Sequence, residues 1–218
     1  MAIAPPLPPA IETLADLVDR LGGVPLTRIR FHPYPGTATV QDVIDASRRN
    51  GKRCELVAGV LVEKPMGWNE SSLAGWLVAM LNIFVLPRNL GIVTIPDGAV
   101  ELREDLVRLP DVAFTRWDRL PDRKRPTRPI PNIAPNLAVE VLSRSNTPRE
   151  MAIKRQDYFA AGVELVWEID LEQRSVVVFT SPADSETLRA GDALTGGAVL
   201  PEFTLAVADL FAELDRQG

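Results

Sequence analysis

The sequence predicts an α/β domain built on a mixed β-sheet, and three observations support this prediction. Segments typical of strands and of helices alternate along the 218 residues instead of gathering in separate halves. Residues 136–143, NLAVEVLS, form a nearly continuous apolar run, which is typical of a central strand covered on both faces. A helix start follows directly, with Thr147 as N-cap, Pro148 at the first helical position and Glu150 completing a capping box.

The sequence predicts two parts, a Pro-rich N-terminal extension over residues 1–37 and a main domain over residues 38–218. Residues 1–10 are rich in proline. An apolar stripe at Leu14, Leu17, Val18 and Leu21 indicates one short amphipathic helix over 11–21, which packs on the domain or on a partner. Residues 24–37 contain three prolines and read as a linker.

Within the main domain, the sequence predicts the following helices and strands. Thr39 caps a first helix, and the two β-rich runs around Ala58-Gly59 form a hairpin. Pro87 stops a strongly apolar second helix, and Gly162 closes the third. The predicted helices cover 40–49, 69–86, 148–161 and 207–214. The predicted strands lie in 54–65, 91–95, 99–103, 106–114, 136–143, 164–170 and 175–181, with a small hairpin region in 184–205 and an irregular segment in 116–135.

Composition excludes several classes of protein. One cysteine, Cys54, excludes an internal disulfide and a cysteine-based zinc cluster, and one histidine, His32, nearly excludes histidine-rich metal sites. A net charge of −5 excludes a histone-like basic protein. The start of the chain lacks the pattern of a signal peptide, and the apolar run 73–86 is too short to cross a bilayer, so we expect a cytoplasmic protein with no membrane partner.

Two acidic residues interrupt apolar strands. Glu140 lies inside the run 136–143, where an ionised carboxylate is costly unless it is paired or bound to a metal. It either has an arginine partner, reaches solvent at a strand end, or belongs to a functional site. Asp111 shares one face of the predicted strand 106–114 with Val107 and Leu109, by period-two alternation, or closes a common Pro-Asp turn.

One lysine lies on a core-facing helix stripe. Lys154 shares its face with Met151 and Tyr158, so it either extends past the core to solvent or points at an anionic site. Arg155 and Asp157 lie off that face and read as solvated charges. Among the hairpin acids, Glu55 opens a strand and is a candidate member of the same acidic cluster, although a surface position is the simpler interpretation.

Two or three carboxylates and a lysine, without a usable histidine or cysteine, predict a Mg²⁺ or Mn²⁺ site. A metal-bound water near a lysine is one means of cleaving a phosphodiester bond.

At this point the sequence resembles a known family. Pro110-Asp111 followed by Glu140-Val141-Leu142 resembles the PD-(D/E)xK nuclease pattern, and five pieces in order resemble its Uma-type branch of restriction-endonuclease-like proteins. The resemblance covers about residues 38–214; the pieces are ELVAGVLVE (55–63), LPDV (109–112), APNLAVEVLS (134–143), TPREMAIKRQDYFAAGVELVWEID (147–170) and VLPEFTL (199–205).

The resemblance implies a restriction-endonuclease-like fold, with a central mixed sheet flanked by helices. It also implies that Asp111 and Glu140 hold the metal, with the Val141 carbonyl as a further ligand, and that Glu55 assists. Leu142 stands where the superfamily has its lysine, and Lys154, from the following helix, takes that place and orients the attacking water.

The irregular segment is a candidate nucleic-acid contact. Six basic and two acidic residues give it a net charge of +4, so it either binds phosphates or is a solvated loop. The basic residues are Arg116, Arg119, Arg123, Lys124, Arg125 and Arg128.

The sequence therefore predicts a Mg²⁺-dependent endonuclease, a hydrolase that acts on nucleic acid, with DNA as the expected partner and a homodimer as its expected assembly. The alternative is a nuclease fold that no longer cuts and serves as a binding module for nucleic acid or protein. A Ser-His hydrolase and a P-loop or Rossmann protein are disfavoured because their motifs do not occur.

Overall fold

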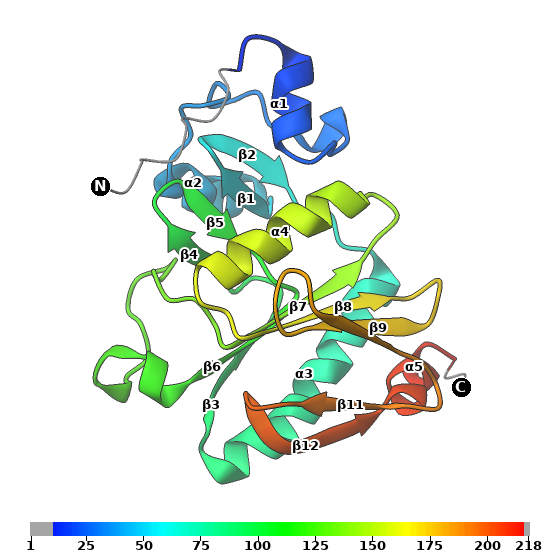
Figure 1. Ribbon diagram of the computed structural model, residues 1–218. Coiled ribbons are helices and arrows are strands. Elements are labelled where there is room, and N and C mark those ends of the chain that lie inside the picture. The colour runs from blue at the N-terminus through cyan, green and yellow to red at the C-terminus, as the bar shows by residue number, and fades with distance from the viewer. Residues whose placement is uncertain (1–10, 216–218) are drawn as a thin grey trace, which may run out of the picture.

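The computed structural model describes residues 11–215, so the Pro-rich residues 1–10 lie outside the described residues. The chain forms a six-stranded mixed sheet, a four-stranded antiparallel sheet and a two-stranded ribbon (Figure 1). The helices are α1 (Leu14–Arg20), α2 (Val40–Asn50), α3 (Trp68–Arg88), α4 (Pro148–Ala160) and α5 (Val207–Asp215), with 3₁₀ turns η1 (Leu26–Arg28), η2 (Trp117–Arg119) and η3 (Pro121–Arg123).

The six-stranded sheet has the order β10-β9-β8-β7-β6-β3, in which only β7 and β8 run parallel. The four-stranded sheet has the order β2-β1-β5-β4, and β11 pairs with β12. The strands are β1 (Cys54–Val57), β2 (Val60–Glu63), β3 (Gly91–Thr94), β4 (Val100–Arg103), β5 (Leu106–Arg108), β6 (Val112–Arg116), β7 (Leu137–Leu142), β8 (Leu165–Asp170), β9 (Ser175–Phe179), β10 (Ser185–Leu188), β11 (Ala193–Gly196) and β12 (Leu200–Ala206).

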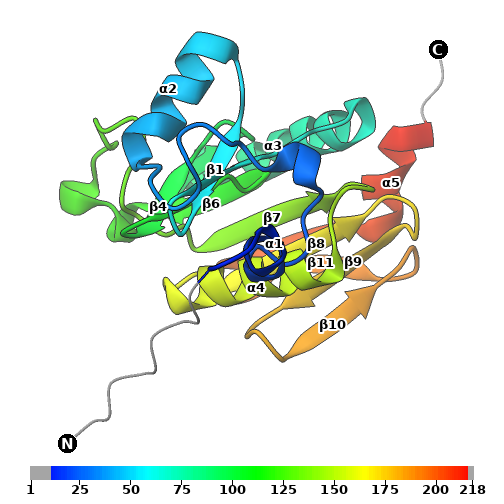
Figure 2. The same ribbon diagram turned by 90° about the horizontal axis from the view of Figure 1, so that it is seen from above.

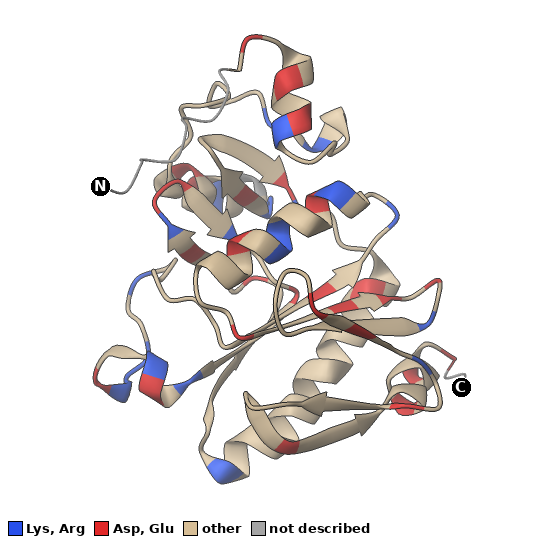
Figure 3. Cartoon of the chain, in the orientation of Figure 1, with Lys and Arg blue, Asp and Glu red and all other residues tan. Residues whose placement is uncertain are grey.

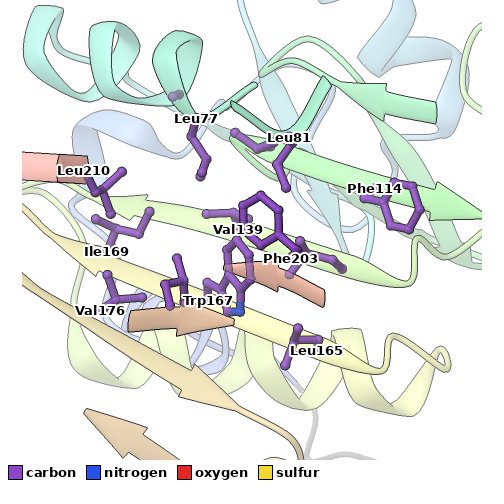
Figure 4. Packing of buried hydrophobic residues seen from close by; sticks show 14 of the residues in the cluster. Leu77, Leu81, Phe114, Val139, Leu165, Trp167, Ile169, Val176, Phe203 and Leu210 are labelled. Atoms are coloured by element: carbon purple, nitrogen blue, oxygen red, sulfur yellow. The ribbon is translucent and has the colours of Figure 1, made fainter. Parts of the chain in front are cut away.

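Helices cover both faces of the six-stranded sheet. α4 lies on one face, while α3, α5 and the ribbon cover the other (Figures 1 and 2). Leu77 and Leu81 of α3 pack there with Val139, Trp167 and Phe203 in the largest hydrophobic cluster (Figure 4). The predicted mixed α/β fold, a central sheet flanked by helices, is confirmed.

The four-stranded sheet is covered separately. On one side, Val43 of α2 packs with Leu56 and Leu109. Leu17 of α1 and Leu21, the C-cap of that helix, pack against the hairpin that contains β2. Of the two predicted roles for the N-terminal helix, packing on the domain is therefore the one observed. Leu14 of its stripe stays 63% exposed.

Several predicted boundaries are wrong. Segment 106–114 is not one strand, because it breaks at Pro110 into β5 and β6, which belong to different sheets. Proline has no amide hydrogen to donate to a neighbouring strand, so a strand breaks there. Residues 106–114 are all buried, so the predicted alternation of two faces around Asp111 does not apply. Pro87 lies inside α3, in its last turn, and Asn89 ends the helix in the left-handed conformation. In the predicted hairpin region, β10 instead adds to the edge of the main sheet.

α3 is the one helix within residues 11–215 that is long and apolar enough to span a membrane. Its residues Leu73, Ala74, Leu77, Leu81 and Val85 are fully buried under the sheet. This is the pattern of a core helix, in which one face is covered and the other, with Ile83, meets solvent.

The N-terminal segment is fixed to α4 by a buried ion pair. Arg28 donates two hydrogen bonds to Glu150, of 2.7 and 3.0 Å, and others to the carbonyls of Glu63 and Ser145. The Thr147 hydroxyl donates to the Gly22 carbonyl at 2.5 Å. Arg28 thus ties together the segment before α2, the end of β2 and the start of α4.

Replacing Arg28 with alanine should lower the free energy of unfolding by about 3–5 kcal/mol, because Glu150 would remain buried without its partner. Arg30→Ala is the matched control: Arg30 pairs with the partly exposed Glu63 at 3.3 Å, so we expect at most about 1 kcal/mol. Urea unfolding measures the free energy of unfolding of both variants. Equal losses in the two would contradict the role of Arg28 as the buried partner of Glu150.

Candidate active site

The predicted acidic residues meet where the two sheets join, under α4. Glu55 comes from β1 of the four-stranded sheet, Glu140 from β7 at the centre of the six-stranded sheet, and Asp111 from the link between β5 and β6. All three are buried, with at most 3% of the residue exposed. Both sheets are thus needed to assemble the site.

Asp111 is held directly beside Glu140 by the β6–β7 ladder. The amide of Asp111 donates to the Val139 carbonyl at 2.9 Å, and its Oδ2 accepts from the amide of Val141 at 2.8 Å. These bonds lie on either side of Glu140 in the sequence. Strand alternation then places Glu140 on the α4 face, opposite the α3 core that contains Val139 and Val141. Val141, predicted as a carbonyl ligand, therefore also positions Asp111 through its amide.

Lys154 and Tyr158 of α4 reach Glu140 from above the sheet. Lys154 Nζ lies 3.3 Å from both Glu140 carboxylate oxygens and 2.9 Å from Glu55 Oε1. The Tyr158 hydroxyl donates to Glu140 Oε1 at 2.6 Å. Residues 154 and 158 are one helical turn apart, so one face of α4 delivers both groups. Lys154 therefore points at an anionic site, which was one of its two predicted roles.

Arg108 completes the buried network behind Glu55. Its guanidinium contacts Glu55 Oε2 at 2.8 Å and Asp157 Oδ2 at 2.5 Å. Asp157 was predicted to be solvated, but the helix turns it toward Arg108. Arg155 is likewise paired, with Glu168 at 2.8 Å. The prediction was wrong for both because the adjoining sheets cover more of α4 than its apolar stripe indicates.

Lys64, like Arg108, is a site residue that the sequence did not single out. Its Nζ lies 2.8 Å from Glu140 Oε2 and 3.0 Å from Asp111 Oδ1, and it donates to the Leu109 carbonyl at 2.5 Å. It follows β2 in the polar stretch Glu63-Lys64-Pro65, which resembles any solvated strand end. No local pattern distinguishes it, because its partners are 45 and 76 residues away.

Burial and neighbouring charges move the two central carboxyl groups in opposite directions. Burial raises the pKa of Asp111, and the nearby charge of Glu140 adds to this rise despite the opposing charge of Lys64. Burial also disfavours ionised Glu140, but Lys154 and Lys64 outweigh it and lower its pKa. Burial similarly opposes the ionisation of Glu55, whose pKa is lowered by Lys154 and Arg108.

A cleft of about 920 Å³ is lined by close sequence neighbours of the cluster residues, whereas the charged side chains of the cluster do not line it. Pro65, which follows Lys64, lines it, as do Leu142, two residues after Glu140, and Met151, one turn before Lys154. Glu168, the partner of Glu140 across the parallel β7–β8 pair, also lines it. The cleft gives a ligand access to the ends of the elements that carry the site.

The predicted basic residues of 116–135 do not join this cluster. Arg116 ends β6, five residues beyond Asp111, and pairs with Glu164 at 2.8 Å; Arg119 pairs with the same carboxylate at 2.6 Å. Arg128 pairs with Glu101 at 3.2 Å. Arg123, Lys124 and Arg125 are exposed. Figure 3 shows this segment at the lower left, with basic and acidic positions intermixed.

The oxygen atoms around Lys64 are of the kind that Mg²⁺ and Mn²⁺ prefer. Two carboxylates and a backbone carbonyl converge on one cation, and Asp111 Oδ1 is buried without a well-directed hydrogen bond. Within residues 11–215 no three Asp, Glu, His or Cys side chains cluster as a metal site. A divalent ion would therefore rest on Asp111, Glu140, main-chain oxygen and water, which is a common arrangement for Mg²⁺.

The chain is thus a mixed α/β protein with a buried carboxylate–lysine cluster where its two larger sheets meet. Residues 40–208 match the model of the Uma2 family, described as "Putative restriction endonuclease", so the chain belongs to that family. No curated protein is significantly similar. A solved structure, "a putative nuclease belonging to DUF820" from Anabaena variabilis, superposes with a TM-score of 0.67 at 22% identity, covering 76% of this chain and 93% of that chain. This likeness supports the fold.

Glu55→Gln should destabilise the protein by about 3–5 kcal/mol at pH 7, because Lys154 and Arg108 would lose a buried partner. The pKa of Glu55 is lowered by folding from an ordinary value of 4.5, so its stabilising contribution is complete above about pH 4.5 and is lost as the pH falls further. The difference between variant and wild type should therefore shrink below pH 4.5.

Chemical unfolding at pH 7, 5 and 3.5 measures this difference. Glu186→Gln, at an exposed position of β10, is the control, with an expected change within about 0.5 kcal/mol. A loss for Glu55→Gln that grows as the pH falls would contradict the assignment.

Proposed function

We propose that this protein is a divalent-metal-dependent endonuclease that hydrolyses phosphodiester bonds, with DNA as its expected substrate. The observation that carries the proposal is the convergence of Asp111 and Glu140 on one cation at the junction of two sheets, with Lys154 on Glu140. Membership in the Uma2 family supports the reaction class.

In this proposal Asp111, Glu140 and the Val141 carbonyl hold Mg²⁺ or Mn²⁺. When bound, the ion supplies a water of lowered pKa and polarises the phosphate. Lys154 keeps Glu140 ionised and supplies positive charge where negative charge develops on the phosphate. Glu55, held by Arg108 and Lys154, fixes the position of the Lys154 ammonium. Tyr158 orients Glu140 through its hydroxyl.

The second candidate function is a nuclease fold that binds but does not cut. The observation that favours it is the internal neutralisation of the carboxylates, since Asp111 and Glu140 both contact Lys64. Binding of nucleic acid or protein without metal and without turnover would support this alternative. Mg²⁺-dependent cleavage that requires Asp111 would exclude it.

Asp111→Asn and Glu140→Gln should each weaken Mn²⁺ binding and reduce cleavage by at least about 100-fold, since loss of a ligand should exceed the effect of losing a supporting residue. Calorimetry measures Mn²⁺ affinity. Cleavage is measured on three substrates: supercoiled plasmid, linear duplex DNA and single-stranded RNA. Glu186→Gln is the control and should leave both properties unchanged. Cleavage that survives both substitutions would refute the assigned site.

We further propose that the exposed residues of the basic segment contact phosphates of a long substrate. Arg123, Lys124 and Arg125 are the candidates, because Arg116, Arg119 and Arg128 are paired with glutamates. The segment begins at Arg116, the last residue of β6 and five residues beyond Asp111, so the strand that follows the proposed metal ligand leads into it.

Replacing Arg123, Lys124 and Arg125 together with alanine should reduce the slope of log affinity against log salt by about three, since each phosphate contact contributes about 0.9. Filter binding at several salt concentrations measures the slope. Arg48 and Arg49, exposed on α2, are the control pair. An unchanged slope in the triple variant would assign the segment to the solvated surface.

A further inference from the structure

The position of Lys64 bears directly on how a metal could enter the proposed site. Its ammonium nitrogen lies 2.8 Å from Glu140 Oε2, 3.0 Å from Asp111 Oδ1 and 2.5 Å from the Leu109 carbonyl. Mg²⁺ requires its oxygen ligands at about 2.0–2.1 Å. An ion bound to the same two carboxylate oxygens would lie within about 5 Å of the ammonium, where two cations repel in a buried site. The ammonium and the ion therefore compete for these oxygens.

Lys64 is also the lysine of the site that can leave it. Its side chain is 10% exposed, whereas that of Lys154 is fully buried on α4. Its backbone is fixed, because its amide donates to the Arg53 carbonyl at 2.8 Å, but its four-carbon stem is flexible. The next residue, Pro65, lines the 920 Å³ cleft. The ammonium is thus held by the contacts of a flexible side chain, while the backbone of Lys64 stays in place.

We propose that Lys64 is the built-in counter-cation of the metal site, and that a divalent ion binds by displacing its ammonium from Asp111 and Glu140. The inference rests on the proposed metal site and adds a residue that controls metal affinity. Without metal, two adjacent buried carboxylates need a cation, and Lys64 supplies it. The observed metal affinity is then the affinity of the vacated site multiplied by the fraction of molecules in which Lys64 has left it. A site vacated in one molecule in ten binds tenfold more weakly.

The test is Mn²⁺ binding by calorimetry and thermal unfolding of Lys64→Met, at constant pH and ionic strength. We expect Mn²⁺ to bind at least tenfold more tightly than in the wild type. The metal-free variant should unfold at a lower temperature, because Asp111 and Glu140 lose their shared cation. Saturating Mn²⁺ should raise the melting temperature of the variant by more than that of the wild type.

Lys52→Met is the matched control, because it removes the same charge from the same hairpin region. The Lys52 ammonium contacts Glu63 at 2.9 Å and does not touch the proposed ligands. Its Mn²⁺ affinity should stay within twofold of the wild type. If Lys64→Met does not fold, Lys64→Gln, which is neutral but retains a hydrogen-bond donor, is read by the same criteria.

Two results would overturn the inference, and they differ in what they mean for the proposed function. Mn²⁺ affinity that is unchanged or weaker in the Lys64 variant, with clear binding in the wild type, would reject displacement and leave the metal site standing. No binding in wild type or variant would reject the metal site itself. Binding that is detectable only in the variant would support displacement.

Discussion

Charge balance in one buried cluster is the constraint on which the rest of the structure depends. Burial disfavours the ionised form of all three carboxyl groups of the cluster, those of Glu55, Asp111 and Glu140. The positive charges of Lys64, Lys154 and Arg108 oppose this effect. The cluster takes members from both sheets, from the link between them and from α4. Its ion pairs therefore fix how the two sheets meet, and a change to one charge affects the position of several elements.

The apolar framework makes this charged junction possible. Strand alternation in β7 places Val139 and Val141 in the α3 core and Glu140 on the α4 side, so the same strand serves the core and the site. Pro110 ends β5 and allows the chain to pass from one sheet to the other, with Asp111 at the point of passage. The N-terminal segment then secures the start of α4 through Arg28 and Glu150. The site is thus enclosed by β1, β7 and α4, and Lys64, which directly follows β2, contacts it from the hairpin.

The sequence predicted the residues that break a local pattern and missed those that do not. Glu140 stands out in an apolar run, and Lys154 stands out on a helix face with Met151 and Tyr158; the structure brings both together with Asp111 and Glu55. Lys64 and Arg108 are ordinary in their own segments and gain meaning only from partners about 50 or more residues away. The same limit explains the error at 106–114: the predicted alternation assumed one strand in one sheet, whereas the chain changes sheets at Pro110. Whether these residues hold metal and cut nucleic acid stays a prediction.

The two lysines at Glu140 differ in a way that bears on mechanism. Lys154 is fully buried, lies on a helix and is shared between Glu140 and Glu55, so its position is set by the fold. Lys64 follows a strand end, contacts both proposed metal ligands and is partly exposed, so in our proposal its position depends on whether a metal ion is bound. A permanent ammonium and an exchangeable one at the same carboxylate would let the protein stay folded without metal and still admit it. The cost is a lower metal affinity, which makes occupancy depend on the divalent ion concentration around the protein.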